Sequence, residues 1–312
     1  MALMAGSAGA GRAIAPLELR RNHESILKIS LAAHSGLMHA RALIEKGSFE
    51  EAIGVLDGLD STLSSLPVPG EGPLGSSIIT ARGIALFCLD RSAEALDELD
   101  RAVALGADNA LTHSYRASAL LALGRPEDAL ASFGRVTGLV PDAVHAILGS
   151  AHALQLLDRH AEAADAYERA MALDGGLAEA HHGRAVSLDM MGRHEEALAL
   201  HDKAVGLDPD NAESHASRAT SLLCLGRYDE ALAASERAIG LDPDHSPNQH
   251  AHGDALLRLG RHEDALAAYD CAAELDPGAA DLHRARAGAL DALGRKREAG
   301  EARRRAEELG GA

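Results

Sequence analysis

The stretch AESHASRATSLLCLGRYDEALAASERAIGLDPD, residues 212–244, decides the fold. Its first half carries small and apolar residues at the spacing of one helical face, and Gly226 then ends that helix in the usual C-terminal role of glycine. A second helical run starts with the acidic pair Asp229-Glu230, which the helix dipole favours. It ends before Pro243, because a residue that precedes proline resists the α conformation. The stretch therefore predicts two helices joined by a short turn.

The same pattern recurs every 34 residues along the chain. One series is always leucine, a second is always alanine, and a third is glycine or aspartate followed by arginine. The series are Leu86, Leu120, Leu154, Leu188, Leu222, Leu256 and Leu290; Ala95, Ala129, Ala163, Ala197, Ala231, Ala265 and Ala299; and Asp90, Gly124, Asp158, Gly192, Gly226, Gly260 and Gly294. A fixed period of this length indicates a repeat array in which neighbouring units bury one continuous core.

One earlier copy is offset by nine extra residues. Leu43, Gly47 and Ala52 match the three series at a spacing of 43, and the Pro/Gly-rich segment 65–77 supplies the insertion as a loop. We therefore predict a flexible segment at 1–15, a capping helix at 16–32 and an array over 33–312. Its eight units are 33–75, 76–109, 110–143, 144–177, 178–211, 212–245, 246–279 and 280–312.

A second series of small residues lies at the eighth position of each unit. It comprises Ala40, Gly83, Ala117, Ala151, Ala185, Ala219, Gly253 and Ala287. We expect it to meet the alanine series where two helices cross closely, since a larger side chain there would cost about 1–3 kcal/mol through overpacking.

These residues resemble the tetratricopeptide repeat family. The 34-residue period matches, as do the small residues at the eighth and twentieth positions, the glycine at the fifteenth and the proline at the thirty-second. The resemblance implies an all-α, right-handed α-solenoid superhelix of eight helix-turn-helix repeats. It also implies that the first helices line a concave groove for peptides or partner proteins. One departure is histidine at the fourth position, where the family has a bulky aromatic: His113, His181, His215 and His283.

Composition narrows the classes of partner. The net charge of −17 argues against nucleic acid and against an anionic membrane surface. No apolar run is long enough for a membrane span and no secretory signal is evident, so we expect a cytoplasmic protein. The three cysteines, Cys88, Cys224 and Cys271, show no disulfide or zinc spacing, and we expect them to be buried or half-buried.

The inward positions that the family resemblance implies select a candidate groove in repeats four to seven. The candidate partner-binding residues are His145, Leu148, His152, Gln155, Glu179, His182, Val186, Asp189, Met190, Thr220, His250 and Asp254. This mixture of carboxylates, imidazoles and apolar groups suits a basic or mixed apolar-cationic protein or peptide. We therefore favour a protein–protein interaction scaffold or adaptor, and a homo-oligomer is compatible with the pattern.

The alternative is a small-molecule or metal-binding protein, including a catalytic accessory, that uses the histidines of the central groove. Two histidines and a carboxylate can bind a transition metal, but His145 and His152 are seven residues apart and so about 10 Å apart along one helix. No catalytic motif is present, and we predict no catalytic residue, cofactor or resident metal. A further stripe, Arg82, Arg116, Arg184, Arg218 and Arg286, is interpreted as inter-helix ion pairing rather than an anion track.

Overall fold

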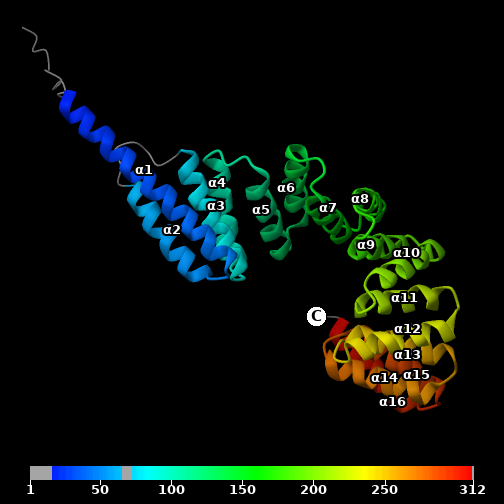
Figure 1. The fold of residues 1–312 in the computed structure, drawn as a ribbon. Coiled ribbons are helices and arrows are strands. Elements are labelled where there is room, and N and C mark those ends of the chain that lie inside the picture. Colours follow the sequence, from blue (N-terminus) through cyan, green and yellow to red (C-terminus); the bar gives the residue numbers. More distant parts are fainter. Residues whose placement is uncertain (1–15, 65–71, 311–312) are drawn as a thin grey trace, which may run out of the picture. The chain divides into compact units, whose positions relative to one another are not determined.

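The computed structural model describes residues 16–64 and 72–310. Within these ranges the chain forms sixteen α-helices and no β-strand (Figure 1). The chain divides into two compact units, residues 1–139 and 140–312, and each is considered by itself. In both units the helices follow one another as antiparallel pairs, one pair to each predicted repeat.

The first unit contains three helix pairs. Its helices are α1 (Pro16–Glu45), α2 (Phe49–Ser64), α3 (Pro73–Cys88), α4 (Ser92–Ala104), α5 (Ala110–Ala122) and α6 (Pro126–Leu139). Each helix packs against the next, and the first helices α1, α3 and α5 also contact one another in that order. The first helices therefore form one wall of the unit and the second helices form the other.

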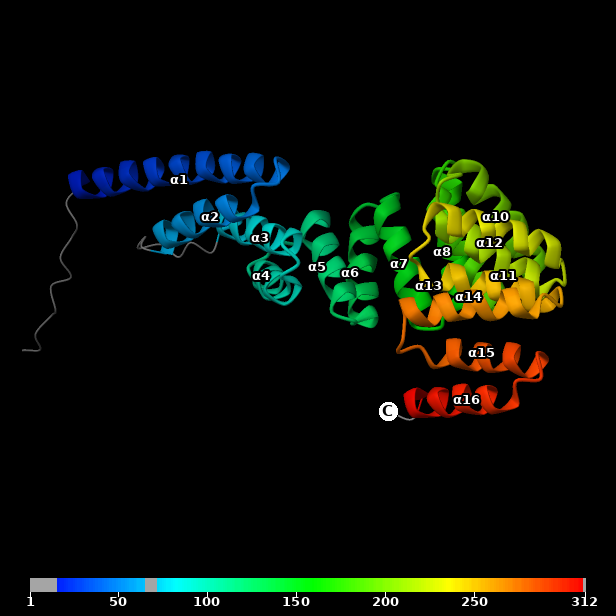
Figure 2. The ribbon, with the colours of Figure 1, turned by 90° about the horizontal axis from the view of Figure 1, so that it is seen from below.

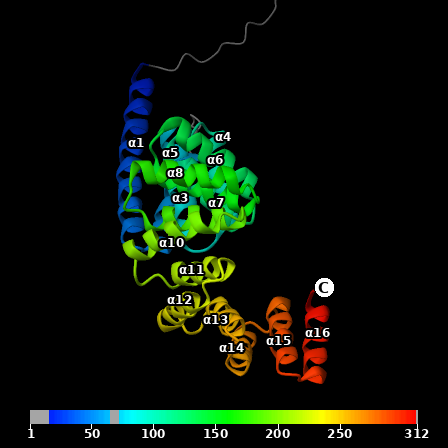
Figure 3. The same ribbon diagram turned by 90° about the vertical axis from the view of Figure 1, so that its right-hand side faces the viewer.

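The second unit contains five helix pairs arranged by the same rule (Figures 2 and 3). Its helices are α7 (Val144–Leu156), α8 (His160–Leu173), α9 (Ala178–Met190), α10 (His194–Leu207), α11 (Ala212–Cys224), α12 (Tyr228–Leu241), α13 (Ser246–Arg258), α14 (His262–Leu275), α15 (Ala280–Ala292) and α16 (Lys296–Gly310). The first helices, from α7 to α15, contact one another in sequence. Each unit is thus an α-solenoid.

The N-terminal part differs from the expected boundaries in two places. Residues 16–32 continue without a break into α1, which ends only at Glu45, and the predicted segment 1–15 lies outside the described residues. The prediction of a loop over 65–77 is wrong at its end, because α3 already begins at Pro73. Proline is suited to the first turn of a helix, where its missing N–H has no partner to lose.

The two series of small residues form the centre of the packing. The alanine series from Ala52 to Ala299 has no exposed surface at any of its eight positions. The eighth-position series is buried throughout, and at Gly253 an added Cβ would lie 2.6 Å from a ring carbon of Tyr269. The expected close helix crossing is therefore present, and larger residues are excluded by contact.

The turn between the helices of each pair requires a left-handed residue. Gly226 has φ +72°, and the equivalent glycines have similar values. Asp90 and Asp158 occupy the same position with φ 58° and 55°, a region that aspartate enters more readily than most side chains. This explains why the third sequence series contains glycine and aspartate only.

The histidines at the fourth position have different partners. Nε2 of His113 is hydrogen-bonded to the carboxylate of Asp108, and Nε2 of His283 has no hydrogen-bond partner among the described residues, whereas the other two bond a carbonyl in the turn before their repeat. Nε2 of His181 donates to the carbonyl of Gly175 at 3.1 Å, and Nε2 of His215 donates to the carbonyl of Pro209 at 3.0 Å. Both side chains are buried. At His181 and His215 the imidazole thus fills the aromatic position and also satisfies a turn carbonyl, which accounts for the departure from the family pattern in these two repeats.

The seventh-position arginines form the expected inter-helix ion pairs. Arg82 contacts Asp57, Asp60 and Glu98 from both neighbouring second helices. The other members pair with a carboxylate on the preceding second helix: Arg116 with Asp100, Arg184 with Glu168, Arg218 with Asp202 and Arg286 with Asp270. The interpretation as structural pairing is confirmed.

Candidate functional site

The candidate groove residues all lie on first helices of the second unit. Their exposure falls into two groups. Those that are exposed are His145, His152, Glu179, Met190 and Thr220; those that are half-buried are Leu148, Gln155, His182, Val186, Asp189, His250 and Asp254. The exposed fraction of Met190 is 63%, which is high for an apolar side chain. The face therefore offers both polar and apolar atoms to solvent.

Gln155 is committed to contacts within the chain. Its Nε2 donates to the carbonyl of Gly183 at 2.9 Å and to Oγ of Ser187 at 3.0 Å, and its Oε1 accepts from the hydroxyl of Tyr167 at 2.8 Å. These bonds join α7 and α8 to α9. The Gln155 amide thus stabilises the junction between repeats four and five, and its polar atoms are engaged before any partner arrives.

Asp189 is the centre of a polar cluster where α9, α10 and α11 meet. Its carboxylate accepts from Nε2 of His201 at 3.0 Å, from Nδ1 of His194 at 2.9 Å and from Oγ of Ser221 at 2.5 Å. Burial opposes ionisation of this carboxyl, but the hydrogen bonds from His201, Ser221 and His194 outweigh it and lower its pKa. His201 itself is completely buried.

His182 lies beside this cluster and faces several polar groups. Its ring centroid is 5.6 Å from that of His201 on α10. On α11, Glu213 lies 3.6 Å from its Nε2 and Ser214 lies 3.4 Å from its Nδ1. Burial lowers the pKa of His182, while the nearby Glu213 carboxylate acts in the opposite direction. The predicted groove residues His182 and Asp189, seven residues apart on α9, thus both contact His201 on α10, a residue that the sequence did not indicate.

A hollow of about 660 Å³ opens on the first-helix face of repeats six to eight. This face is the surface formed by the first helix of each repeat. Its apolar lining comes from Leu223 on α11, Leu257 on α13 and Ala292 on α15. Its polar lining is formed by Thr220, Cys224, Tyr228, Asp254, Arg258 and His262. Thr220 and Asp254 were predicted as groove residues, whereas Tyr228 and His262 were not. Both of these stand first in the second helix of their repeat, a position outside the family's inward set.

Asp254 is held in place at the wall of this hollow. The hydroxyl of Tyr269 donates to its Oδ1 at 2.6 Å. Burial, together with the Asp254 charge, raises the pKa of Tyr269 above its ordinary range, so the phenol stays protonated and remains a donor. Arg258, one helical turn along α13, makes no hydrogen bond or ion pair with any described residue. The hollow therefore presents one anchored carboxylate and one available guanidinium over an apolar floor.

The cysteines are on the surface, so the expectation of buried or half-buried thiols is wrong. Cys88, Cys224 and Cys271 are all exposed. Cys88 and Cys224 end α3 and α11 at the first-helix face, and Cys271 lies on the outward side of α14. Burial by nearby groups raises the pKa of Cys224, which disfavours the reactive thiolate.

The metal-binding alternative gains no support from the side-chain geometry. Among the side chains that the structure describes, no three from His, Cys, Asp or Glu are placed so that they could hold one ion. Within residues 16–64 and 72–310, no helix is both long and apolar enough to cross a membrane.

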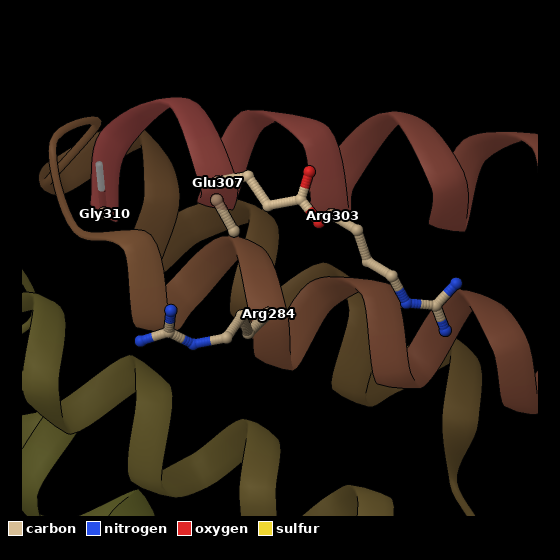
Figure 4. Close-up of a pocket in the computed structure, with 5 residues that line it drawn as sticks. Arg284, Arg303, Glu307 and Gly310 are labelled. Carbon is tan, nitrogen blue, oxygen red and sulfur yellow. The ribbon is translucent and has the colours of Figure 1, made fainter. Parts of the chain in front are cut away.

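A second hollow of the same unit lies between α15 and α16 (Figure 4). It has a volume of about 550 Å³ and is lined by Arg284, Arg303, Ala306, Glu307 and Gly310. Both arginines are engaged by neighbouring carboxylates, Arg284 by Asp281 and Arg303 by Asp291. Its charged groups are therefore largely satisfied within the chain.

Paired antiparallel helices with a continuous first-helix face define the class of α-solenoid repeat proteins. Models of known protein families match the chain in the same way. The tetratricopeptide repeat model matches residues 80–143, 116–178 and 250–312, which together exceed half of the chain, and a second such model matches 178–200. The chain belongs to the tetratricopeptide repeat family. The model for anaphase-promoting complex (cyclosome) subunit 3 also matches residues 190–272.

Solved structures share the fold at low sequence identity. A tetratricopeptide repeat protein from Parabacteroides merdae ATCC 43184 is 16% identical with a TM-score of 0.65, covering 83% of this chain and 99% of that one. A monomeric IFIT1 mutant with Gppp-AAAA is 18% identical with a TM-score of 0.54, covering 86% and 67%. YrrB, described as a TPR protein with an unusual peptide-binding site, is 22% identical with a TM-score of 0.46, covering 57% and 92%. No curated protein matches the chain.

Proposed function

We propose that the chain is a cytoplasmic interaction scaffold that holds a partner protein or peptide on the first-helix face of repeats four to seven. The observation that carries this proposal is the hollow of about 660 Å³ lined by Leu223, Asp254 and Leu257. Its volume lies in the range of specific ligand sites, and its lining combines apolar and polar side chains. Membership of the family adds the general expectation of protein binding.

The charges of this face select the partner. Glu179 and Glu213 are exposed on α9 and α11, and Asp254 adds a half-exposed carboxylate on α13. Met190 and Leu257 supply apolar surface on the same helices. The three carboxylates outnumber the one available guanidinium, that of Arg258, so a segment that alternates apolar and cationic side chains complements this surface, and electrostatic attraction would speed its association.

A charge reversal with a matched control tests the proposal. The probe is a fluorescent peptide of alternating leucine and lysine, titrated by polarisation against the full chain. Glu213→Lys reverses a charge on the first helix of repeat six, whereas Glu236→Lys makes the same change on the exposed side of its second helix, α12. We expect Glu213→Lys to weaken binding about 5-fold or more, a coupling of about 1 kcal/mol, and Glu236→Lys to leave it within about 2-fold.

Equal losses in the two variants would show that only the net charge of the chain attracts the peptide, and the first-helix face would then lose its assigned role. Light scattering of the same samples reports whether the scaffold acts as a single chain or as a homo-oligomer. A wild-type chain that binds none of the probe peptide would refute the proposed partner chemistry.

A further inference from the structure

The first unit has a hollow of its own on its first-helix face. It has a volume of about 310 Å³ and is formed by α1, α3 and α5. Its lining consists of Arg41, Ile44, Glu45, Thr80, Ala81, Ile84, Leu111 and Tyr115. Most of these are the inward positions of repeats one to three, outside the candidate groove that the sequence predicts in repeats four to seven. The first-helix face is therefore hollowed in both units.

The surface of this hollow is mainly apolar. Leu111 keeps 49% of its surface exposed although it is a large aliphatic residue. The ring of Tyr115 meets that of Phe87 edge to face, with centroids 5.9 Å apart, which fixes its orientation. The hydroxyl of Thr80 is satisfied by Thr112 at 3.1 Å. The wall between the helices thus offers an apolar surface on which the one threonine hydroxyl is already paired.

The charge of the hollow differs from that of the face in the second unit. Its two ionisable rim groups, Arg41 and Glu45, have opposite signs and lie one turn apart on α1. Neither makes an ion pair or hydrogen bond with a described residue. The rim therefore carries no net charge, and it gives a cationic segment no advantage over an uncharged one.

We propose that this hollow binds a single bulky apolar side chain, leucine, methionine or phenylalanine, presented by an uncharged peptide segment of a partner protein. The volume of about 310 Å³ admits one such side chain. Burial of an apolar anchor in a preformed pocket is a common source of peptide affinity. The inference rests on the proposed function, because it also assigns a partner to first helices, but it adds a separate site with a different chemistry in the first unit.

The test uses a library of displayed random twelve-residue peptides, selected on the full-length chain. Peptides that share one bulky apolar residue and lack net charge are synthesised and titrated by calorimetry. The variant Leu111→Glu places a carboxylate in the hollow, where an apolar anchor would have to desolvate it. The control Leu123→Glu makes the same change at another exposed leucine of repeat three, outside the hollow.

We expect Leu111→Glu to weaken these peptides about 10-fold or more, and both Leu123→Glu and the conservative Leu111→Met to leave their affinity within about 2-fold. Equal affinity for wild type and Leu111→Glu, with a normal circular dichroism melt, would overturn the inference. Dissociation of a dimer by Leu111→Glu would also overturn it, because the hollow would then hold a second copy.

The same peptides separate this inference from the proposed function. Glu213→Lys in the second unit should leave their binding unchanged. Loss of their binding in Glu213→Lys but not in Leu111→Glu would refute the apolar site and keep the scaffold proposal. Enrichment of no peptide at all by the wild-type chain would refute both.

Discussion

The hydroxyl of Tyr269 donates a hydrogen bond of 2.6 Å to Asp254, and its ring lies directly over Gly253, the neighbouring residue on α13. Tyr269 has no exposed surface, whereas Asp254 lines the hollow on the first-helix face. One buried side chain thus both fills the core of repeat seven and positions a surface carboxylate. Stability and site geometry are linked at this contact, and substitutions on either side of it test the link.

Removal of the hydroxyl by Tyr269→Phe should destabilise the chain. A hydrogen bond to a charged group contributes about 1.5–3 kcal/mol, and the ring volume is unchanged. The measurement is the urea midpoint of the full chain. Tyr228→Phe removes a hydroxyl that has no hydrogen-bond partner among the described residues, so its midpoint should stay near that of wild type. Equal losses in the two variants would contradict the role given to the Tyr269–Asp254 bond.

Addition of a methyl group at Gly253 should also destabilise the chain. The Cβ of Gly253→Ala would lie 2.6 Å from Cε1 of Tyr269, a ring atom held inside the core, and overpacking of this kind costs about 1–3 kcal/mol. Gly288→Ala in α15 is the control, because its Cβ would meet nothing within 4 Å. The free energy of unfolding of that variant should rise by about 0.5–1 kcal/mol, because alanine has less conformational entropy than glycine in the unfolded chain. A gain in both midpoints would show that the Tyr269 ring moves freely.

The eight helix pairs were predictable because several independent residue series keep one phase. The series at Leu222, Ala219 and Ala231 report core positions, and buried positions tolerate little change in volume. The start of α3 was missed because Pro73 stands in a Pro/Gly-rich stretch, where composition favours a loop although proline also suits a first helical turn. The exposure of Cys224 was missed because residue type alone does not give a helix face.

The polar cluster of the second unit was only half predictable. His182 and Asp189 follow from the inward positions, but His201 lies on a second helix. A signal was present at its position, the twenty-fourth of each repeat. This position holds the buried residues Leu56, Leu99, Phe133 and Tyr167, then His201 and Ser235, then Tyr269. A change from apolar to polar residues at a core position indicates a buried hydrogen-bond network, since an unpaired polar group there would be costly.

Replacement of a left-handed aspartate by glycine should stabilise the first unit. Asp90 has φ 58°, whereas glycine occupies the equivalent turn position in most other repeats. Relief of this conformation in Asp90→Gly is expected to contribute about 1 kcal/mol, seen as a higher urea midpoint. Gly226→Ala makes the opposite change at φ +72° and should lower the midpoint by a similar amount. No difference between the two variants would show that the turn relaxes without strain.

The buried histidines predict that stability falls in mild acid. The pKa of His182 in the folded chain lies below its ordinary value because the ring is buried. The unfolded chain therefore takes up a proton near pH 6.5 while the folded chain does not. The stabilising contribution of neutral His182 is complete above about pH 6.5 and is lost as the pH falls through the lower, folded pKa. His201 and Glu213 face the ring of His182. The carboxylate of Asp189 accepts hydrogen bonds from both His194 and His201.

A comparison of urea midpoints at about pH 7.5 and about pH 5 checks this prediction. The wild-type midpoint should fall between the two pH values, and His182→Gln should show a smaller fall, because glutamine does not titrate. His152→Gln is the matched control, since His152 is an exposed histidine on α7 and its removal should leave the pH dependence of the wild type. An unchanged pH dependence in His182→Gln would mean that the acid sensitivity, if present, arises outside the junction of repeats five and six.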